Sequence, residues 1–172
     1  DADSWQAVQQ QLSTNQQGHH RRTRAREPSL LAGLLHDADG HRLIPSHATT
    51  GERRYRYYVQ EQAIAGTPAV RKLRLPAPEI ERAVQMTLLD ALNSPGQLLT
   101  HFNGRLSAQQ TLIAMQSAAA RHAELEQATP QKWRDTLQSL VDSIRVQADS
   151  LQITVRSQSL TEWLGVREMD VP

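Results

Sequence analysis

Arginine and tyrosine alternate in one short run of this chain, and these two side chains together suit a polyanion. The run is RRYRYY, residues 53–58, and it contains all three tyrosines of the protein. A guanidinium carries a fixed fork of donors that matches phosphate oxygens and the edge of guanine, and a tyrosine can stack or donate to phosphate. The run therefore predicts a contact with nucleic acid. An ordinary exposed strand with positive charge is the alternative.

The side chains of this run are expected to divide between the two faces of a strand, because successive strand residues point to opposite sides. The two sets are Arg53, Tyr55, Tyr57 and Val59, and Arg54, Arg56 and Tyr58. We expect the first set to turn its rings inward against Leu34 and Leu43. We expect the second set to lie on the open face and to meet the nucleic acid.

Two further basic clusters flank this run. Residues 16–27 read QQGHHRRTRARE, with no apolar period. Their arginines are Arg21, Arg22, Arg24 and Arg26. An arm of this composition binds DNA by neutralising phosphates and releasing counterions, or by inserting arginine into the minor groove. A plain solvated linker is the alternative. The other cluster, Arg71 and Lys72, follows the tyrosines.

Three short strands are expected to hold the central run. Residues 30–35 are apolar, Asp39-Gly40 is typical of a tight turn, and residues 42–47 are expected to alternate between the faces of a strand, with Leu43 on one face and Arg42 and Ile44 on the other. Pro45 cannot donate a ladder hydrogen bond, so its strand is expected to be an edge or to carry a bulge. The Arg/Tyr run itself forms the third strand.

The second half of the chain predicts helices. Pro78 starts one at the first-turn position that proline tolerates, and Ser107 with Gln110 caps a long alanine-rich helix that ends near residue 128. Thr129-Pro130 begins a further helix.

Residues 144–155 alternate around Asp149-Ser150 as a β-hairpin, and Ser159 with Glu162 is expected to cap a last turn of helix. The fold class is therefore α+β. It comprises a small antiparallel β ribbon at about residues 30–60, a helical region and a C-terminal β-hairpin.

Charge and composition narrow the possible partners. Residues 1–76 hold eleven Lys and Arg against seven Asp and Glu, a net of +4, whereas residues 77–172 hold eight against eleven, a net of −3. The asymmetry favours a polyanion partner for the first half, and an uneven solvated surface is the alternative.

The chain has no cysteine, which excludes disulfides and thiolate zinc sites. It shows neither a membrane-length apolar run nor a signal-peptide plan, so we expect a cytoplasmic protein with no membrane partner. The chain starts without an initiator Met, and we expect a fragment of a longer protein.

The stretch from residue 30 to residue 59 resembles a known family. It reads LLAGLLHDADGHRLIPSHATTGERRYRYYV and is similar to the zinc-ribbon-like segment in the C-terminal half of large site-specific serine recombinases, of the resolvase/invertase superfamily. Residues 4–9 with the arginine arm resemble the end of that family's DNA-binding domain, and residues 140–153 resemble the region after the ribbon. The resemblance implies a bacterial, nucleoid-associated protein of DNA recombination and integration.

The chain departs from the family pattern where many members carry a Cys-x-x-Cys and further cysteines after the tyrosine-rich strand. Here the first turn reads HDADG, residues 36–40, and Gln60 follows the third strand. The remaining candidate ligands for a metal are His36, Asp37, Asp39, His41 and His47. Their spacing matches no familiar metal site, so we expect no metal and no cofactor.

The family's nucleophilic serine belongs to a catalytic domain that would precede residue 1. Ser46 and His47 are neighbours in sequence, but adjacent strand residues point to opposite faces, so we do not expect a Ser–His relay. This fragment is therefore not expected to be an enzyme, although its parent is expected to be a DNA recombinase. The sequence does not favour a small hydrolase, because it shows no acid, base or metal ligands that would converge in one site.

The resulting hypothesis is a fragment that binds double-stranded DNA and recognises the recombination site. The expected DNA-binding residues are Arg21, Arg22, Arg24, Arg26, Arg42, Ser46, His47, Arg53, Arg54, Arg56, Tyr58, Arg71 and Lys72. The expected regions are an N-terminal helix and basic arm that end a preceding DNA-binding domain (1–27), a zinc-ribbon-like β domain without zinc (28–76) and a helical and hairpin region (77–172). The alternative is a protein-interaction module for synapsis, a homo-oligomer formed through the long helix at 107–128.

Overall fold

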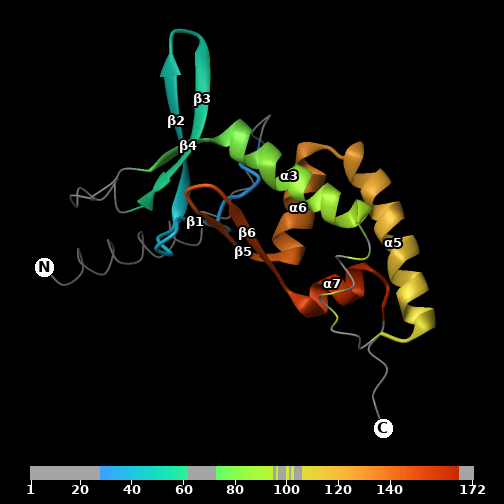
Figure 1. Cartoon of the computed structure of the whole chain (residues 1–172). Coiled ribbons are helices and arrows are strands. Elements are labelled where there is room, and N and C mark those ends of the chain that lie inside the picture. Colours follow the sequence, from blue (N-terminus) through green and yellow to red (C-terminus); the bar gives the residue numbers. More distant parts are fainter. Residues whose placement is uncertain are drawn as a thin grey trace, which may run out of the picture.

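The computed structural model describes residues 28–61, 73–94 and 106–166, together with Gly96, Thr100 and Phe102. The expected N-terminal helix, the four arginines of the arm, Arg71 and Lys72 lie outside these residues. The elements in chain order are β1 (Leu35–His36), β2 (Leu43–Thr50), β3 (Arg53–Gln60), β4 (Arg74–Pro76), α3 (Ala77–Asn93), α5 (Ala108–Glu126), α6 (Pro130–Leu140), β5 (Val141–Val146), β6 (Leu151–Val155) and α7 (Ser157–Trp163) (Figure 1).

The strands form two small sheets, and the α+β class with a ribbon, helices and a C-terminal hairpin is confirmed. One sheet has the order β2-β3-β4 and is antiparallel throughout. The other has the order β1-β5-β6, in which β1 runs parallel to β5 and β5 pairs antiparallel with β6. The first and last parts of the described chain therefore share a sheet.

The strand expected over residues 30–35 is mostly absent from the part of the chain described here. Residues 30–34 form turns, and only Leu35 and His36 are extended, where they pair with Ile144 and Arg145 of β5. Gly33 adopts a φ of +86°, which a strand does not allow. The apolar run is explained by burial, because its four leucines pack in the core. The strand that joins β2 and β3 in the ribbon is β4, and not residues 30–35.

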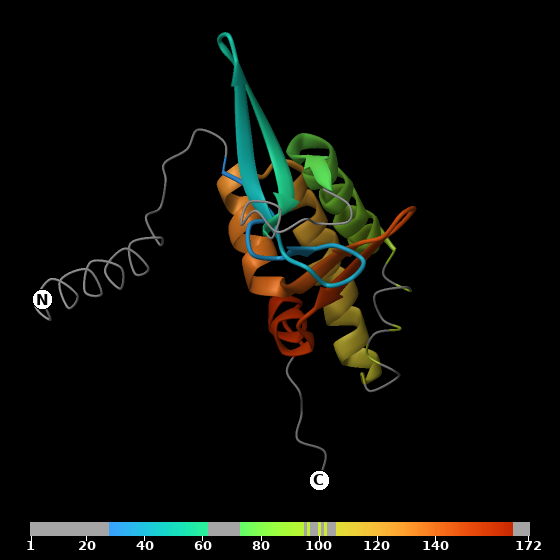
Figure 2. The same cartoon turned by 90° about the vertical axis from the view of Figure 1, so that its left-hand side faces the viewer.

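The β2–β3 hairpin extends beyond the rest of the described body as a two-stranded ribbon (Figures 1 and 2). Its turn lies at Gly51, whose φ of +59° suits glycine, and Thr50 pairs with Arg53 directly beside it. β2 is an edge strand of its sheet, as Pro45 predicts.

The helix starts follow the local sequence closely. Pro78 lies in the first turn of α3, Ser107 and Gln110 form the predicted capping box of α5, and the Thr129 hydroxyl caps α6. At the C-terminal end, α6 ends at Leu140 and β5 begins at once, with the Leu140 carbonyl accepting from the Arg156 N–H at 2.8 Å. One expectation is wrong here, because α7 begins at Ser157, two residues before the predicted cap at Ser159.

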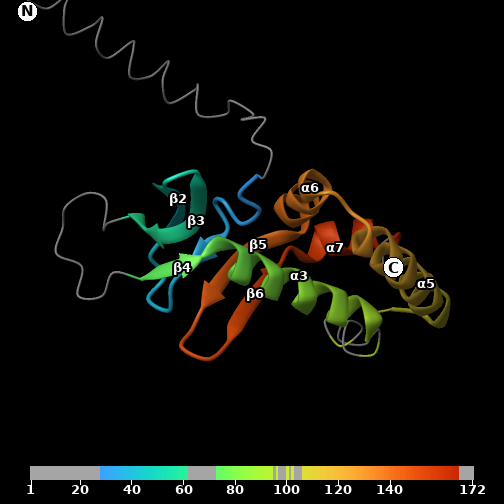
Figure 3. The same ribbon diagram turned by 90° about the horizontal axis from the view of Figure 1, so that it is seen from above.

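The core is built from leucine, with isoleucine, valine and alanine in support. Leu31, Leu35 and Ile144 are fully buried where β1 meets β5, and the Ile144 N–H donates to the Leu34 carbonyl at 2.8 Å. Each such side chain contributes roughly 1.5–3 kcal/mol of transfer free energy. α3 extends from β4 toward α5 (Figure 3). No helix among the described residues is long and apolar enough to cross a membrane.

Candidate nucleic-acid interface

The outer half of the β2–β3 hairpin is polar, basic and exposed. Arg53 and Arg54 are exposed beside the turn, and Tyr55 keeps 43% of its surface accessible. Across the ribbon, Arg54 pairs with Thr49 and Arg53 pairs with Thr50, both of which are also exposed. The end of the hairpin therefore presents two guanidiniums among hydroxyl groups. Phosphates and the edges of bases can accept hydrogen bonds from these groups.

The inner half of the same hairpin is packed into the body, and here the prediction of which face is buried is wrong. Tyr58 is completely buried instead of lying on the open face, and the side chain of Arg56 is only 19% exposed. The rings of Tyr55 and Tyr57 lie on the other side of the ribbon, where Arg74 stacks over the ring of Tyr57 at 3.7 Å. Tyr58 and Arg56 turn toward the body because α3 supplies a partner for both side chains.

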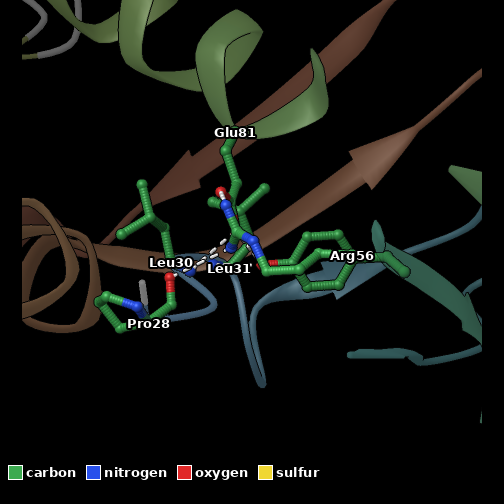
Figure 4. Close-up of polar contacts among 6 residues, drawn as sticks. Pro28, Leu30, Leu31, Arg56 and Glu81 are labelled. Atoms are coloured by element: carbon green, nitrogen blue, oxygen red, sulfur yellow. Dashed lines mark hydrogen bonds and ion pairs between the residues drawn. The ribbon is translucent and has the colours of Figure 1, made fainter. Parts of the chain in front are cut away.

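That partner is Glu81, a buried carboxylate in the first half of α3. It accepts hydrogen bonds from the Tyr58 hydroxyl at 2.8 Å and from the Leu30 N–H at 3.0 Å. The guanidinium of Arg56 donates through both of its terminal nitrogens, at 3.3 and 3.2 Å (Figure 4). Arg56 also donates to the carbonyl of Pro28 at 3.4 Å. A fork that meets both carboxylate oxygens is the strong, geometrically specific form of ion pair.

Tyr58 is held in its neutral form by these surroundings. Burial raises the pKa of its hydroxyl, and the negative charge of Glu81 raises that pKa further. The neutral hydroxyl can donate to Glu81 while accepting from the Leu31 N–H at 2.9 Å. Tyr58 thus links the turn at residues 30–34 to α3 and is not available to a ligand on the surface.

A second buried carboxylate, Asp37, organises the turn between β1 and β2. Its Oδ1 accepts from the backbone N–H groups of Asp39 at 3.0 Å and His41 at 2.8 Å. Its Oδ2 accepts from the side-chain amide of Gln60 and lies 3.2 Å from Nδ1 of His41. The φ of +88° at Gly40 completes the predicted turn. The carboxylate therefore ties this turn to the end of β3.

Asp37, Asp39 and His41 bring potential metal ligands within 4.8 Å of one another. Both carboxylate oxygens of Asp37 already accept hydrogen bonds, so a cation bound there would have to displace these donors. The donor set resembles a hydrogen-bonded turn more than an open coordination site.

Replacing Asp37 by asparagine is expected to lower the free energy of unfolding by ~1–3 kcal/mol at pH 7, because charge-assisted hydrogen bonds are lost. Burial alone would raise the pKa of Asp37, but the hydrogen bonds from Gln60 and His41 lower it below 3.8 overall. The ionised group therefore stabilises the fold fully above pH 3.8, and this contribution declines as the pH falls through the lower folded value. Urea unfolding of both proteins at several pH values measures the difference.

A stability difference between wild type and Asp37→Asn that persists unchanged at strongly acidic pH contradicts this assignment. The same experiment with a chelator is expected to leave the unfolding midpoint of the wild type unchanged, because hydrogen bonds hold the turn.

The remaining predicted DNA-binding residues are spread along the hairpin. His47 is exposed and Ser46 half-buried in the middle of β2, whereas Arg42 is exposed at the inner end. With a strand rise of ~3.3 Å per residue, Arg42 lies ~23 Å from the level of Thr49, the partner of Arg54. The structure thus brings Arg53 and Arg54 to the projecting end, places His47 opposite Arg56 and leaves Arg42 at the base.

The sequence interpretation missed Glu81, although a pattern could have revealed it. The buried face of α3 carries Ala77, Glu81, Val84, Leu88 and Leu92, at the spacing of one helix stripe. A glutamate in register with an apolar stripe requires a buried cation or donor as partner.

This chain shows a weak likeness to solved structures, among them the two that follow. No family model and no curated protein matches the chain. One solved structure, described as "Crystal Structure of a LSR-DNA Complex", is 13% identical with a TM-score of 0.47, over 85% of this chain and 61% of that chain. The other, described as "Sequence Requirements of the Listeria innocua prophage attP site", is 13% identical with a TM-score of 0.45, over 81% of this chain and 48% of that chain. This chain therefore spans about half to three fifths of the solved chains, one of which is a complex of DNA with an LSR, the abbreviation for a large serine recombinase.

Proposed function

We propose that this chain is the DNA-binding C-terminal part of a site-specific serine recombinase and that it recognises the recombination site without the catalytic serine domain. The observation that carries DNA binding is the projecting β2–β3 hairpin with exposed Arg53 and Arg54 at its end. The recombinase part of the proposal rests on the resemblance of residues 30–59 to that family.

The shape and charge of the hairpin support this proposal. The major groove of B-DNA admits a two-stranded β ribbon, and a ribbon that stands clear of the body can enter it without a clash from the helices. Residues 43–60 contain three arginines and one glutamate, a net of +2. Arg53 and Arg54 would reach phosphates or guanine edges, and His47 and Ser46 would lie deeper along the ribbon.

The other predicted residues take different roles in the proposal. The arm arginines with Arg71 and Lys72 would supply phosphate contacts that do not depend on sequence. Arg56 and Tyr58 would act indirectly, because Glu81 and the core hold their side chains. The parts of the chain before and after residue 76 are proposed to differ in function but not to fold separately. The reason is that β1 lies before residue 76, β5 lies after it, and the two strands share a sheet.

A salt titration of duplex binding tests the proposal. Fluorescence anisotropy of a labelled duplex is expected to show binding at low salt, and the affinity should fall linearly on a double-logarithmic plot. Each neutralised phosphate contributes about 0.9 to the slope, so the slope counts the phosphate contacts. No binding to duplex DNA at about 50 mM salt, with folded protein, would refute the DNA-binding function.

A homo-oligomer formed through α5 is the second candidate, and one observation favours it. Leu112 and Met115 are 51% and 41% exposed on α5. They share a heptad stripe with the exposed Ala108 and Ala119, while Ala114 and other residues on the opposite face are buried. Apolar side chains at this spacing suit a partner helix.

Sedimentation measures this second candidate directly. If α5 self-associates, the wild type forms a concentration-dependent oligomer, and Leu112→Lys with Met115→Lys makes it monomeric because lysines cannot be buried in the seam. Met86→Lys is the matched control, since Met86 is 52% exposed on α3. A wild type that remains monomeric at all concentrations excludes the oligomer.

A further inference from the structure

The buried ion pair between Glu81 and Arg56 lies where the projecting hairpin leaves the body. Toward the turn from Arg56, the residues of β3 are all exposed, and toward the other end Tyr58 is completely buried. The side chains of the pair are 6% and 19% exposed. The pair therefore occupies the boundary between the part of the hairpin that is packed and the part that is free.

Stability alone does not explain a charge at this position. Removing a carboxylate and a guanidinium from water costs several kcal/mol per ion by order of magnitude, and well-packed apolar residues often serve stability equally well. An ion pair with a forked geometry does, however, fix direction, because both oxygens and both nitrogens must be aligned at once. Among the described residues, every buried side-chain nitrogen and oxygen has a partner, and a hairpin turned away from α3 would have to give up the hydrogen bonds of Arg56 and Tyr58 to Glu81.

We propose that Glu81 is a positioning residue that fixes the direction in which the β2–β3 hairpin projects from α3. Its carboxylate joins three segments, namely the turn at Leu30, the strand β3 through Arg56 and Tyr58, and α3 itself. The part of the proposal that concerns DNA rests on the proposed function. A hairpin held in one direction binds DNA without losing the orientational entropy that a pivoting hairpin loses.

The network also reaches the start of the described chain. Arg56 donates to the carbonyl of Pro28, and the Leu30 N–H donates to Glu81. Pro28 directly follows the basic segment that ends at Glu27. The same carboxylate thus fixes the hairpin and the point from which the basic arm departs, so that two proposed DNA-binding elements share one anchor.

The direction of the hairpin can be measured without DNA. The chain has no cysteine, so spin labels can be attached at Glu52→Cys, in the hairpin turn, and Asp90→Cys, exposed on α3. In this background the distance distribution between the labels is expected to be narrow for wild type. Glu81→Gln removes the charge and one oxygen acceptor at nearly constant volume, and the distribution is expected to broaden to at least twice the width.

Glu79→Gln provides the matched control. Glu79 is exposed in the first turn of the same helix, so its substitution changes the net charge equally and leaves the network intact. Its distance distribution is expected to equal that of wild type. Equal widths for Glu81→Gln and wild type overturn the proposal. If Glu81→Gln does not fold, Tyr58→Phe removes one donor to the carboxylate, and an unchanged width in that variant likewise overturns it.

DNA binding then gives a test in which the two substitutions are expected to change the affinity for DNA in opposite directions. Loss of a negative charge alone favours DNA slightly, so Glu79→Gln is expected to bind equally or more tightly. Glu81→Gln is expected to bind roughly tenfold more weakly, an effect comparable to the loss of one specific contact. Binding of Glu81→Gln as tight as that of Glu79→Gln overturns the positioning role while the proposed function stands. A wild type that does not bind DNA refutes the proposed function, and the label distances still decide the role of Glu81.

Discussion

Duplex DNA binding is expected to weaken roughly 30- to 100-fold at low salt when Arg53 and Arg54 are both replaced by alanine, because each guanidinium supplies one phosphate or base contact. The two side chains lie at the exposed end of the hairpin and can reach DNA without rearrangement. The slope of affinity against salt concentration should fall by about 2 if both contacts are to phosphate. Anisotropy titrations at several salt concentrations measure both quantities.

The matched control removes two other exposed arginines, Arg82 of α3 and Arg145 of β5. It changes the net charge by the same amount, and only a small, general loss of affinity is expected from it. Equal losses in the two double variants would mean that charge alone drives binding and that the hairpin is not the interface. Since Arg53 and Arg54 have exposed side chains, both variants should retain the stability of the wild type within about 0.5 kcal/mol.

The fold of this chain was predictable where the information is local. The turn at Gly40, the caps at Ser107 and Thr129 and the edge position of Pro45 depend on neighbouring residues, so the sequence alone predicts them. The pairing of β1 with β5 was not predicted, because it joins residues from opposite parts of the chain. A two-residue strand carries no periodicity from which such a partner could be inferred.

The candidate site shows the same limit in one residue. β3 has tyrosines on both faces, so the alternation does not indicate which face is buried, and Tyr58 was assigned to the wrong side. The deciding contact is the carboxylate of Glu81, which comes from a helix that follows the sheet in sequence. The exposure of Arg53 and Arg54 does not depend on that contact, because the two residues lie beyond the packed part of the hairpin.

Glu81 is also the position where a single substitution should be most costly. Replacing it by alanine removes the carboxylate that pairs with the guanidinium of Arg56 and that accepts from the Tyr58 hydroxyl and the Leu30 N–H. Breaking one partner of a buried ion pair typically costs ~3–5 kcal/mol, which is a substantial fraction of the ~5–15 kcal/mol stability of an ordinary domain. Urea unfolding followed by circular dichroism measures the loss, with Glu79→Ala on the same helix as control.

A second substitution separates the charge from the contacts. If the cost of Glu81→Ala comes from breaking the buried ion pair, then Arg56→Met together with Glu81→Leu removes both charges, fills the space and should recover ~2 kcal/mol or more relative to Glu81→Ala. Recovery will be incomplete, because the Tyr58 hydroxyl still loses its acceptor. A double variant as unstable as Glu81→Ala would mean that the hydrogen bonds to Tyr58 and Leu30, and not the ion pair, hold the hairpin to α3.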